Sequence, residues 1–206
     1  MSGSNYSRRE LMKMVSLTML GSAVIPEIAR ASKTKLKSDY FDDPPKTIHI
    51  KRGMGKAGVV GGMDLVFKLN KRDTRGHMAC DEVTMKSGFL GAPPHMHKEI
   101  DEVCYVLEGT VNIMVGDEVF EVNAGDWHLR PRGIVHTFWN SSKQTAKFID
   151  IYLPGGHEEY MMDLAKLFEN NAKPKPDDLA ALASKYDIIF SWDRLQAIID
   201  KYKVHL

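Results

Sequence analysis

The chain has 206 residues, of which 43% are hydrophobic, and it carries 28 Lys and Arg residues against 27 Asp and Glu residues. This near balance, without a basic stripe, argues against nucleic acid or an anionic membrane surface as a partner. The length suits one domain with appendages.

The first 31 residues have the parts of an export signal in the right order. Arg8 and Arg9 stand in the sequence Ser-Arg-Arg-Glu-Leu-Met-Lys, an apolar run covers residues 14–26, and Ala29-Arg30-Ala31 offers a small-x-small cleavage site. The apolar run is shorter than the roughly 20 residues that a membrane span needs. Residues 1–31 therefore resemble a twin-arginine signal peptide, which implies export to the periplasm, cleavage after Ala31 and no stable membrane insertion afterwards. An ordinary amphipathic helix is the alternative.

The next segments predict a linker and then a β-rich domain over residues 47–155. Residues 32–46 are charged and contain two consecutive prolines, which predicts the linker, and residues 47–50 alternate like a short strand. Residues 51–62 are rich in glycine, which predicts a loop or tight turns. Strand-like segments then follow at 64–69, 77–85, 102–107, 110–115, 118–122, 127–130, 136–140 and 146–153. Short strands separated by Gly, Pro, Asn and Asp predict a sandwich or barrel.

Residues 156–206 change to a helical period and predict a C-terminal helical extension. Apolar residues are spaced along one helical face over residues 158–170, 177–186 and 191–202. We expect these faces to pack against the barrel or against a second subunit.

Four residues carry the chemistry that this sequence predicts most strongly: His95, His97, Glu102 and His136. Alternation along a strand points His95 and His97 to the same side. A turn must then precede Glu102, and His136 must return on another strand. Three imidazoles and one carboxylate suit a divalent transition metal.

The residues around these four extend the pattern into two motifs. The first contains His95, His97, Glu102 and Gly109, and the second contains Gly125, Pro131, Gly133, His136 and Asn140. Together they resemble the two motifs of the cupin superfamily, although the leading glycine of the first motif falls on Phe89. The resemblance implies a mainly β fold, a single double-stranded β-helix barrel with a C-terminal helical tail. It is specific for fold and metal and weak for the reaction, because many activities share this fold.

The tail resembles that of small single-barrel cupins related to quercetinase-like dioxygenases, and this resemblance implies a function. His95, His97 and His136 would hold the metal, and Glu102 would ligate it and take the proton from a substrate hydroxyl. Iron, manganese or nickel is expected, with copper or zinc as alternatives. The implied activity is that of an oxygenase, a dioxygenase-like oxidoreductase acting on a small aromatic or enolic molecule. The alternatives are a metal-dependent isomerase or lyase acting on a small acid or sugar, and a non-catalytic small-molecule-binding protein.

Related barrels often dimerise by exchanging an N-terminal strand. Residues 47–50 are therefore a candidate for such an exchange in a homodimer.

Four further residues are candidates for the substrate pocket: Cys104, Phe138, His128 and Arg130. Cys104 shares the inward face of its strand with Glu102, and Phe138 is a candidate for the apolar interior. His128 and Arg130 share one face, for which we prefer the outward orientation. If that face points inward, Arg130 favours a carboxylate or phosphate on the ligand, and thus an isomerase or decarboxylase.

The remaining histidines and the cysteines have simpler interpretations. His49, His77, His157 and His205 lack spaced partners and are expected to be ordinary core or surface residues. Cys80 and Cys104 are expected on neighbouring strands. We prefer two separate buried thiols to a disulfide there.

Overall fold

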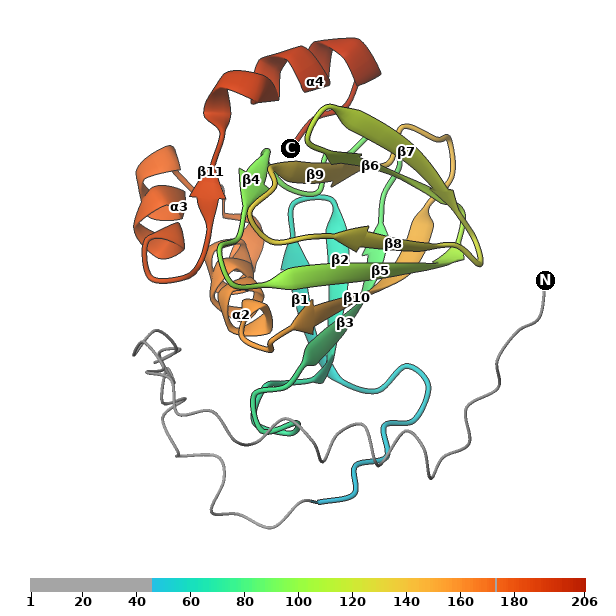
Figure 1. The fold of residues 1–206 in the computed structure, drawn as a ribbon, viewed down its shortest axis with the longest axis vertical. Coiled ribbons are helices and arrows are strands. Elements are labelled where there is room, and N and C mark those ends of the chain that lie inside the picture. The colour runs from blue at the N-terminus through green and yellow to red at the C-terminus, as the bar shows by residue number, and fades with distance from the viewer. Residues whose placement is uncertain (1–45, 173) are drawn as a thin grey trace, which may run out of the picture. The chain divides into compact units, whose positions relative to one another are not determined.

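The computed structural model describes residues 46–172 and 174–206, which form two facing antiparallel sheets and a C-terminal tail (Figure 1). The expected signal peptide and all but the last residue of the expected linker lie outside the described residues. One sheet has the strand order β1-β2-β3-β10-β5-β8 and the other has the order β11-β4-β9-β6-β7. The strands are β1 (Lys56–Val60), β2 (Met63–Leu69), β3 (Ala79–Met85), β4 (His95–Met96), β5 (Asp101–Glu108), β6 (Thr110–Val115), β7 (Glu118–Asn123), β8 (Trp127–Arg130), β9 (His136–Trp139), β10 (Ala146–Leu153) and β11 (Ile189–Phe190).

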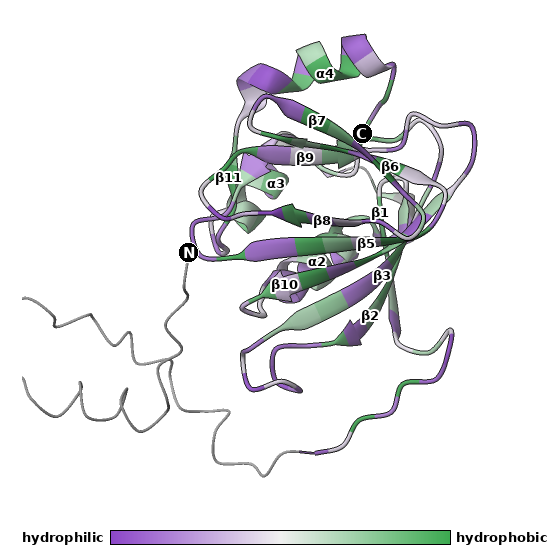
Figure 2. Ribbon diagram, turned by 45° about the vertical axis from the view of Figure 1, so that its right-hand side comes forward, coloured by the Kyte–Doolittle hydropathy of each residue, from purple (hydrophilic) through white to green (hydrophobic). Residues whose placement is uncertain are grey.

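The core lies between the sheets because alternate residues of each strand face inward. Along β5, Glu102, Cys104 and Val106 are buried while their neighbours are partly exposed, and Figure 2 shows hydrophobic and hydrophilic bands following one another along this strand. Large apolar side chains fill the space between the sheets; among those most deeply buried are Leu65, Val83, Met85, Val106, Ile113 and Phe148. The expected fold, mainly β with a C-terminal helical segment, is confirmed.

Gly109 makes the turn that connects β5 of one sheet to β6 of the other. Gly109 has a φ of 74°, and a Cβ atom there would lie 2.8 Å from the carbonyl oxygen of Thr145. Only glycine combines this left-handed backbone conformation with such a close approach. The glycine that closes the first motif therefore has a steric role.

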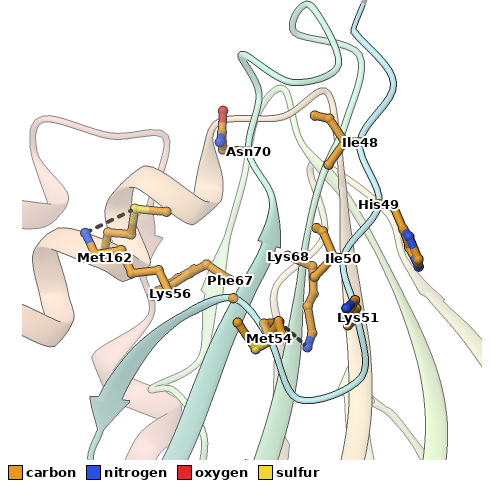
Figure 3. A pocket seen from close by; sticks show the side chains of 11 residues that line it. Ile48, His49, Ile50, Lys51, Met54, Lys56, Phe67, Lys68, Asn70 and Met162 are labelled. Carbon is orange, nitrogen blue, oxygen red and sulfur yellow. Dashed lines mark hydrogen bonds between the residues drawn. The ribbon is translucent and has the colours of Figure 1, made fainter.

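Two predictions about the segment before the barrel are wrong. Residues 47–50 form no strand, although Figure 3 shows Ile48 and Ile50 projecting from one side of this segment and His49 from the other. The alternation is present, but within the described residues no strand pairs with the segment, which borders a surface pocket of about 660 Å³. Residues 51–62, the glycine-rich stretch predicted as a loop or tight turns, contain strand β1. All five residues of β1 pair with β2.

The tail contains three α-helices, α2 (His157–Leu167), α3 (Pro176–Ala183) and α4 (Leu195–Tyr202), and two short 3₁₀ turns, η2 (Glu169–Asn171) and η3 (Trp192–Arg194). Helix α2 buries Tyr160, Met161 and Leu164 in the main core cluster. Ile198 of α4 packs in a second cluster with Trp139 of the barrel. The tail thus packs against its own barrel through its apolar faces. In the part of the chain that the structure describes, none of the helices has the length and apolarity that a membrane crossing requires.

The tail also contains strand β11, which helical periodicity did not predict. Ile189 pairs with Met96 and Phe190 pairs with His95, so β11 extends the sheet at the strand that carries the first candidate ligand. A two-residue strand leaves no periodic signal in the sequence, because its existence depends on the partner strand.

Candidate metal centre

The barrel brings His95, His97, Glu102 and His136 together in its interior. His95 on β4 lies opposite His136 on β9, His97 follows β4, and Glu102 lies on β5. All four side chains are buried, and one nitrogen or oxygen atom of each lies within 4.8 Å of those of the other three. The expected cluster therefore exists in three dimensions.

The Nδ1 atom of each of the three histidines contacts a backbone carbonyl oxygen. Nδ1 of His95 lies 2.8 Å from the carbonyl oxygen of Pro93, and Nδ1 of His136 lies 3.0 Å from that of Ile134. Nδ1 of His97 contacts the carbonyl oxygen of Asp187. Because a carbonyl oxygen can only accept a hydrogen bond, each Nδ1 carries a hydrogen, and in its neutral form each imidazole presents the lone pair of its Nε2 atom. This is the arrangement that metal-binding histidines adopt.

The atoms at the centre of the cluster fit a cation. Nε2 of His136 lies 3.1 Å from Oε2 of Glu102, and Nε2 of His97 lies 3.4 Å from Oε1. Among the described residues, Nε2 of both histidines and Oε2 of Glu102 nevertheless make no hydrogen bond, although Oε2 forms an ion pair with Nη1 of Arg130. Lone pairs that face one another at this distance repel unless positive charge lies between them. A nitrogen-rich set with one carboxylate suits a divalent transition metal ion.

The ionisation of the cluster agrees with this interpretation. Burial, together with the neighbouring imidazoles, holds the pKa of His95 well below its usual value, so the ring is neutral. Burial alone would raise the pKa of Glu102, but the positive charge of Arg130 holds this pKa well below its usual range. Glu102 is therefore a carboxylate at neutral pH. Although burial opposes it, the same carboxylate raises the pKa of His97, so the cluster attracts positive charge.

Arg130 points inward, and the interpretation that placed its face outward is wrong. Its side chain is 1% exposed, whereas Trp127 and Leu129 on the same strand are 62% and 53% exposed. Nη1 of Arg130 lies 3.1 Å from Oε2 of Glu102, and Nη2 donates a hydrogen bond to Asp150. Two buried carboxylates thus compensate the guanidinium charge, which allows a charged residue to take the inner face of β8.

Asp150 completes this network of charges beside the cluster. Burial raises the pKa of Asp150 to about 6, although the charge of Arg130 lowers it. The contact with the guanidinium of Arg130 favours the ionised form of Asp150. Sequence analysis did not select this residue, because an acidic residue at an inward position of β10 has no local partner.

The cluster opens onto a cavity of about 1000 Å³ between the barrel and the tail. His95, Glu102, Arg130 and Phe138 line the cavity, whereas its lining among the described residues does not include Cys104 or His128. The remaining wall is mostly apolar and comes from both parts of the chain: Val60, Met63, Leu65 and Val83 from the barrel, and Met161, Leu164, Ile188 and Phe190 from the tail. The cavity therefore combines a polar end with a large apolar body.

The two cysteines are separate thiols, as preferred, but they are not on neighbouring strands. Strand β10 lies between β3, which carries Cys80, and β5, which carries Cys104. Cys104 is 1% exposed, and burial raises the pKa of its thiol far above the usual value. It acts as a small buried side chain beside the charged network.

His157, expected to be an ordinary core or surface residue, lies at the polar end of the cavity. As the first residue of α2, it places its Nε2 atom 3.7 Å from Oε1 of Glu102, and its ring lies 4.8 Å from that of His97. Burial lowers the pKa of His157 to about 3, so this imidazole is neutral. No spacing in the sequence could have indicated that His157 lies beside the cluster, because its location depends on how the tail packs against the barrel. His49, His77 and His205 are not among the described residues that line the cavity.

Two facing antiparallel sheets enclose the buried set of three histidines and one glutamate. Residues 81–152, about a third of the chain, match the family model described as "Cupin domain". This match supports placing the barrel in the cupin superfamily.

Known relatives resemble parts of the chain. Germin-like protein subfamily T member 2 of Arabidopsis thaliana is 37% identical over 71 residues, which are 31% of this chain and 32% of that protein. Putative germin-like protein 3-2 of Oryza sativa subsp. japonica is 31% identical over 104 residues, 47% of this chain and 45% of that protein. The chain thus spans less than half the length of these curated relatives. Among solved structures, KdgF from Halomonas sp. has a TM-score of 0.49 at 17% identity, covering 55% of this chain and 99% of that chain.

Proposed function

We propose that this protein is a metal-dependent oxygenase of the dioxygenase type that acts on a small aromatic or enolic molecule. The observation that carries the proposal is the convergence of three imidazole nitrogens and one carboxylate at the polar end of a large apolar cavity. His95, His97, His136 and Glu102 would hold one divalent ion, with iron, manganese or nickel favoured over copper or zinc. Such an ion supplies a Lewis acid and, except for zinc, redox chemistry toward oxygen.

The charges around the centre favour a substrate that binds as a monoanion. Arg130 contributes one positive charge against the two negative charges of Glu102 and Asp150. A divalent ion would reverse this balance to one net positive charge, which a singly charged ligand neutralises. An ionised enol provides this charge, and its ring system would occupy the apolar part of the cavity and exclude water.

Glu102 is the group that we propose as the proton acceptor. Arg130 holds its Oε2 atom, whereas its Oε1 atom faces His157 at the cavity wall. The O–H bond of the substrate would break, and the electron pair would stay on the substrate oxygen. The proton would pass first to Oε1 and then to solvent, which leaves Glu102 ionised and the bound substrate as the monoanion.

An isomerase or lyase acting on a small acid remains the second candidate, because Arg130 lines the cavity. Its Nη1 and Nη2 atoms, however, already contact the carboxylates of Glu102 and Asp150. Its Nε atom, by contrast, is buried without a hydrogen-bond partner among the described residues and keeps one donor for a substrate carboxylate.

Oxygen consumption tests the proposed function directly. The metal-loaded protein is supplied with a panel of enolic aromatics, flavonols among them, in an oxygen electrode, and in parallel without oxygen. We expect uptake of oxygen in proportion to substrate loss. Turnover without oxygen would identify the isomerase or lyase, and binding without turnover would identify a non-catalytic binding protein.

Glu102→Gln separates the proton-acceptor role from metal binding. We expect the variant to retain metal and to lose about 100-fold or more in turnover, because a positioned base typically contributes this much. Glu108→Gln, at the exposed end of the same strand, is the matched control and should keep full activity. Undiminished turnover of Glu102→Gln would remove the proton-acceptor role.

We also propose that the chain is exported through its twin-arginine sequence and cleaved after Ala31. Replacing Arg8 and Arg9 together with Lys should leave the uncleaved chain in the cytoplasm, because the signal is recognised through the arginine pair. The unaltered chain should appear in the periplasm with Ser32 as its first residue by mass spectrometry. Equal export of both forms would contradict the proposal.

A further inference from the structure

The metal centre receives one of its supports from the C-terminal tail. The Nδ1 atoms of His95 and His136 contact carbonyl oxygens only two residues upstream in the chain. Nδ1 of His97 instead contacts the carbonyl oxygen of Asp187, which lies 90 residues downstream. The orientation of this one imidazole therefore depends on the path of a distant segment.

The side chain of Asp187 supports the same region a second time. Its Oδ1 atom accepts a hydrogen bond of 3.0 Å from the backbone N–H of Lys98, and its Oδ2 atom accepts one of 2.7 Å from that of Glu99. These are the two residues that follow His97. One residue of the tail thus holds both the imidazole and the backbone that carries it.

The neighbouring residues of the tail keep Asp187 in place. Strand β11 pairs with β4, and the backbone N–H of Ser191 donates a 2.8 Å hydrogen bond to the carbonyl oxygen of Pro94. Ile188 is buried in the main core cluster. Residues 187–191 therefore run alongside residues 94–99, the segment that carries His95 and His97, and are hydrogen-bonded to it.

We propose that Asp187 is a positioning residue of the metal centre and that the tail is required for full metal affinity. The carbonyl oxygen fixes the tautomer and the ring orientation of His97, and the carboxylate anchors the loop after it. Loss of such outer partners typically weakens metal binding by about 10- to 100-fold. The inference rests on the metal-binding part of the proposed function and is independent of the oxygenase reaction.

Zinc affinity of the full chain tests the proposal, because zinc binding is measurable without turnover. Asp187→Ala keeps the backbone carbonyl oxygen that contacts His97 but removes both carboxylate hydrogen bonds that fix the position of this segment. We therefore expect it to weaken zinc binding by about 10-fold, the lower end of the range for outer partners, in competition with a chromophoric chelator. Asp187→Asn retains one acceptor oxygen and should fall between this variant and the unaltered protein. Asp193→Ala is the matched control, because Asp193 is an exposed acidic residue of η3 in the same tail.

Two further readouts separate positioning from general destabilisation. The visible absorption of the cobalt-loaded protein should change in Asp187→Ala and stay constant in Asp193→Ala, because it reports ligand geometry. Urea unfolding of the metal-free proteins measures stability alone. Zinc affinities of Asp187→Ala and Asp187→Asn within about twofold of the control would overturn the proposal, as would a loss of stability with an unchanged cobalt spectrum. An unaltered protein that binds no zinc and no cobalt would overturn it together with the metal site, whereas failure of oxygen uptake alone would leave it standing.

Discussion

Replacing His136 with alanine is expected to abolish stoichiometric metal binding and activity while leaving the barrel folded. His136 is fully buried, its Nδ1 atom is held by the backbone, and its Nε2 atom faces Glu102. The loss should exceed the roughly 100-fold that removal of an outer partner produces, because the variant lacks a ligand itself. The fold should persist because burial of the core, rather than the ion, dominates stability in a domain of this size. Metal analysis and circular dichroism measure the two effects.

Two histidines serve as controls for the His136→Ala variant. His77 is exposed, and His157 is buried beside the cluster without belonging to the set of four. His77→Ala and His157→Ala should both retain about one equivalent of metal. Retention of metal by His136→Ala would contradict the assigned ligands, and global unfolding of His136→Ala at room temperature would show that the ion is structural.

Replacing Arg130 with methionine is expected to destabilise the metal-free protein by about 3–5 kcal/mol, because it leaves two buried carboxylates without their shared counter-charge. Arg130 is 1% exposed and contacts Glu102 and Asp150. Methionine keeps much of the side-chain volume, so the loss reports charge more than packing. Urea unfolding in the presence of a chelator gives the free energy of unfolding.

Arg132→Met is the matched control for this effect. Arg132 also pairs with a carboxylate, that of Asp101, but its side chain is 47% exposed. An exposed pair contributes little to stability, so the loss in Arg132→Met should be far smaller than in Arg130→Met. Adding Asp150→Asn to Arg130→Met should recover part of the lost stability, since it removes one uncompensated charge. Equal losses for Arg130→Met and Arg132→Met would contradict the account of the buried network.

The set of His95, His97, Glu102 and His136 was predictable as a cluster because its signals are local. Strand alternation and the spacing within two short blocks are enough to suggest convergence. The orientation of Arg130 was mispredicted because alternation gives two faces without saying which is buried. The usual preference for apolar residues inside is reversed on β8, where Trp127 stacks outside on Tyr105 at 4.5 Å between ring centroids. Only the positions of Glu102 and Asp150 explain this reversal.

The contributions of the tail could not be predicted from the sequence. The helical period located α2, α3 and α4. His157 and Asp187, however, reach the metal centre through packing between segments far apart in the chain. Strand β11 is two residues long and exists because β4 offers a free edge. The segment at residues 47–50 shows the opposite case, since it alternates like a strand but has no partner among the described residues.

Metal analysis of the protein, purified without metal-affinity steps, tests the central claim most directly. The account predicts about one equivalent of a divalent transition metal per chain, lost in His136→Ala and retained in His157→Ala. A protein that carries no transition metal, and takes up none when it is supplied, would contradict it.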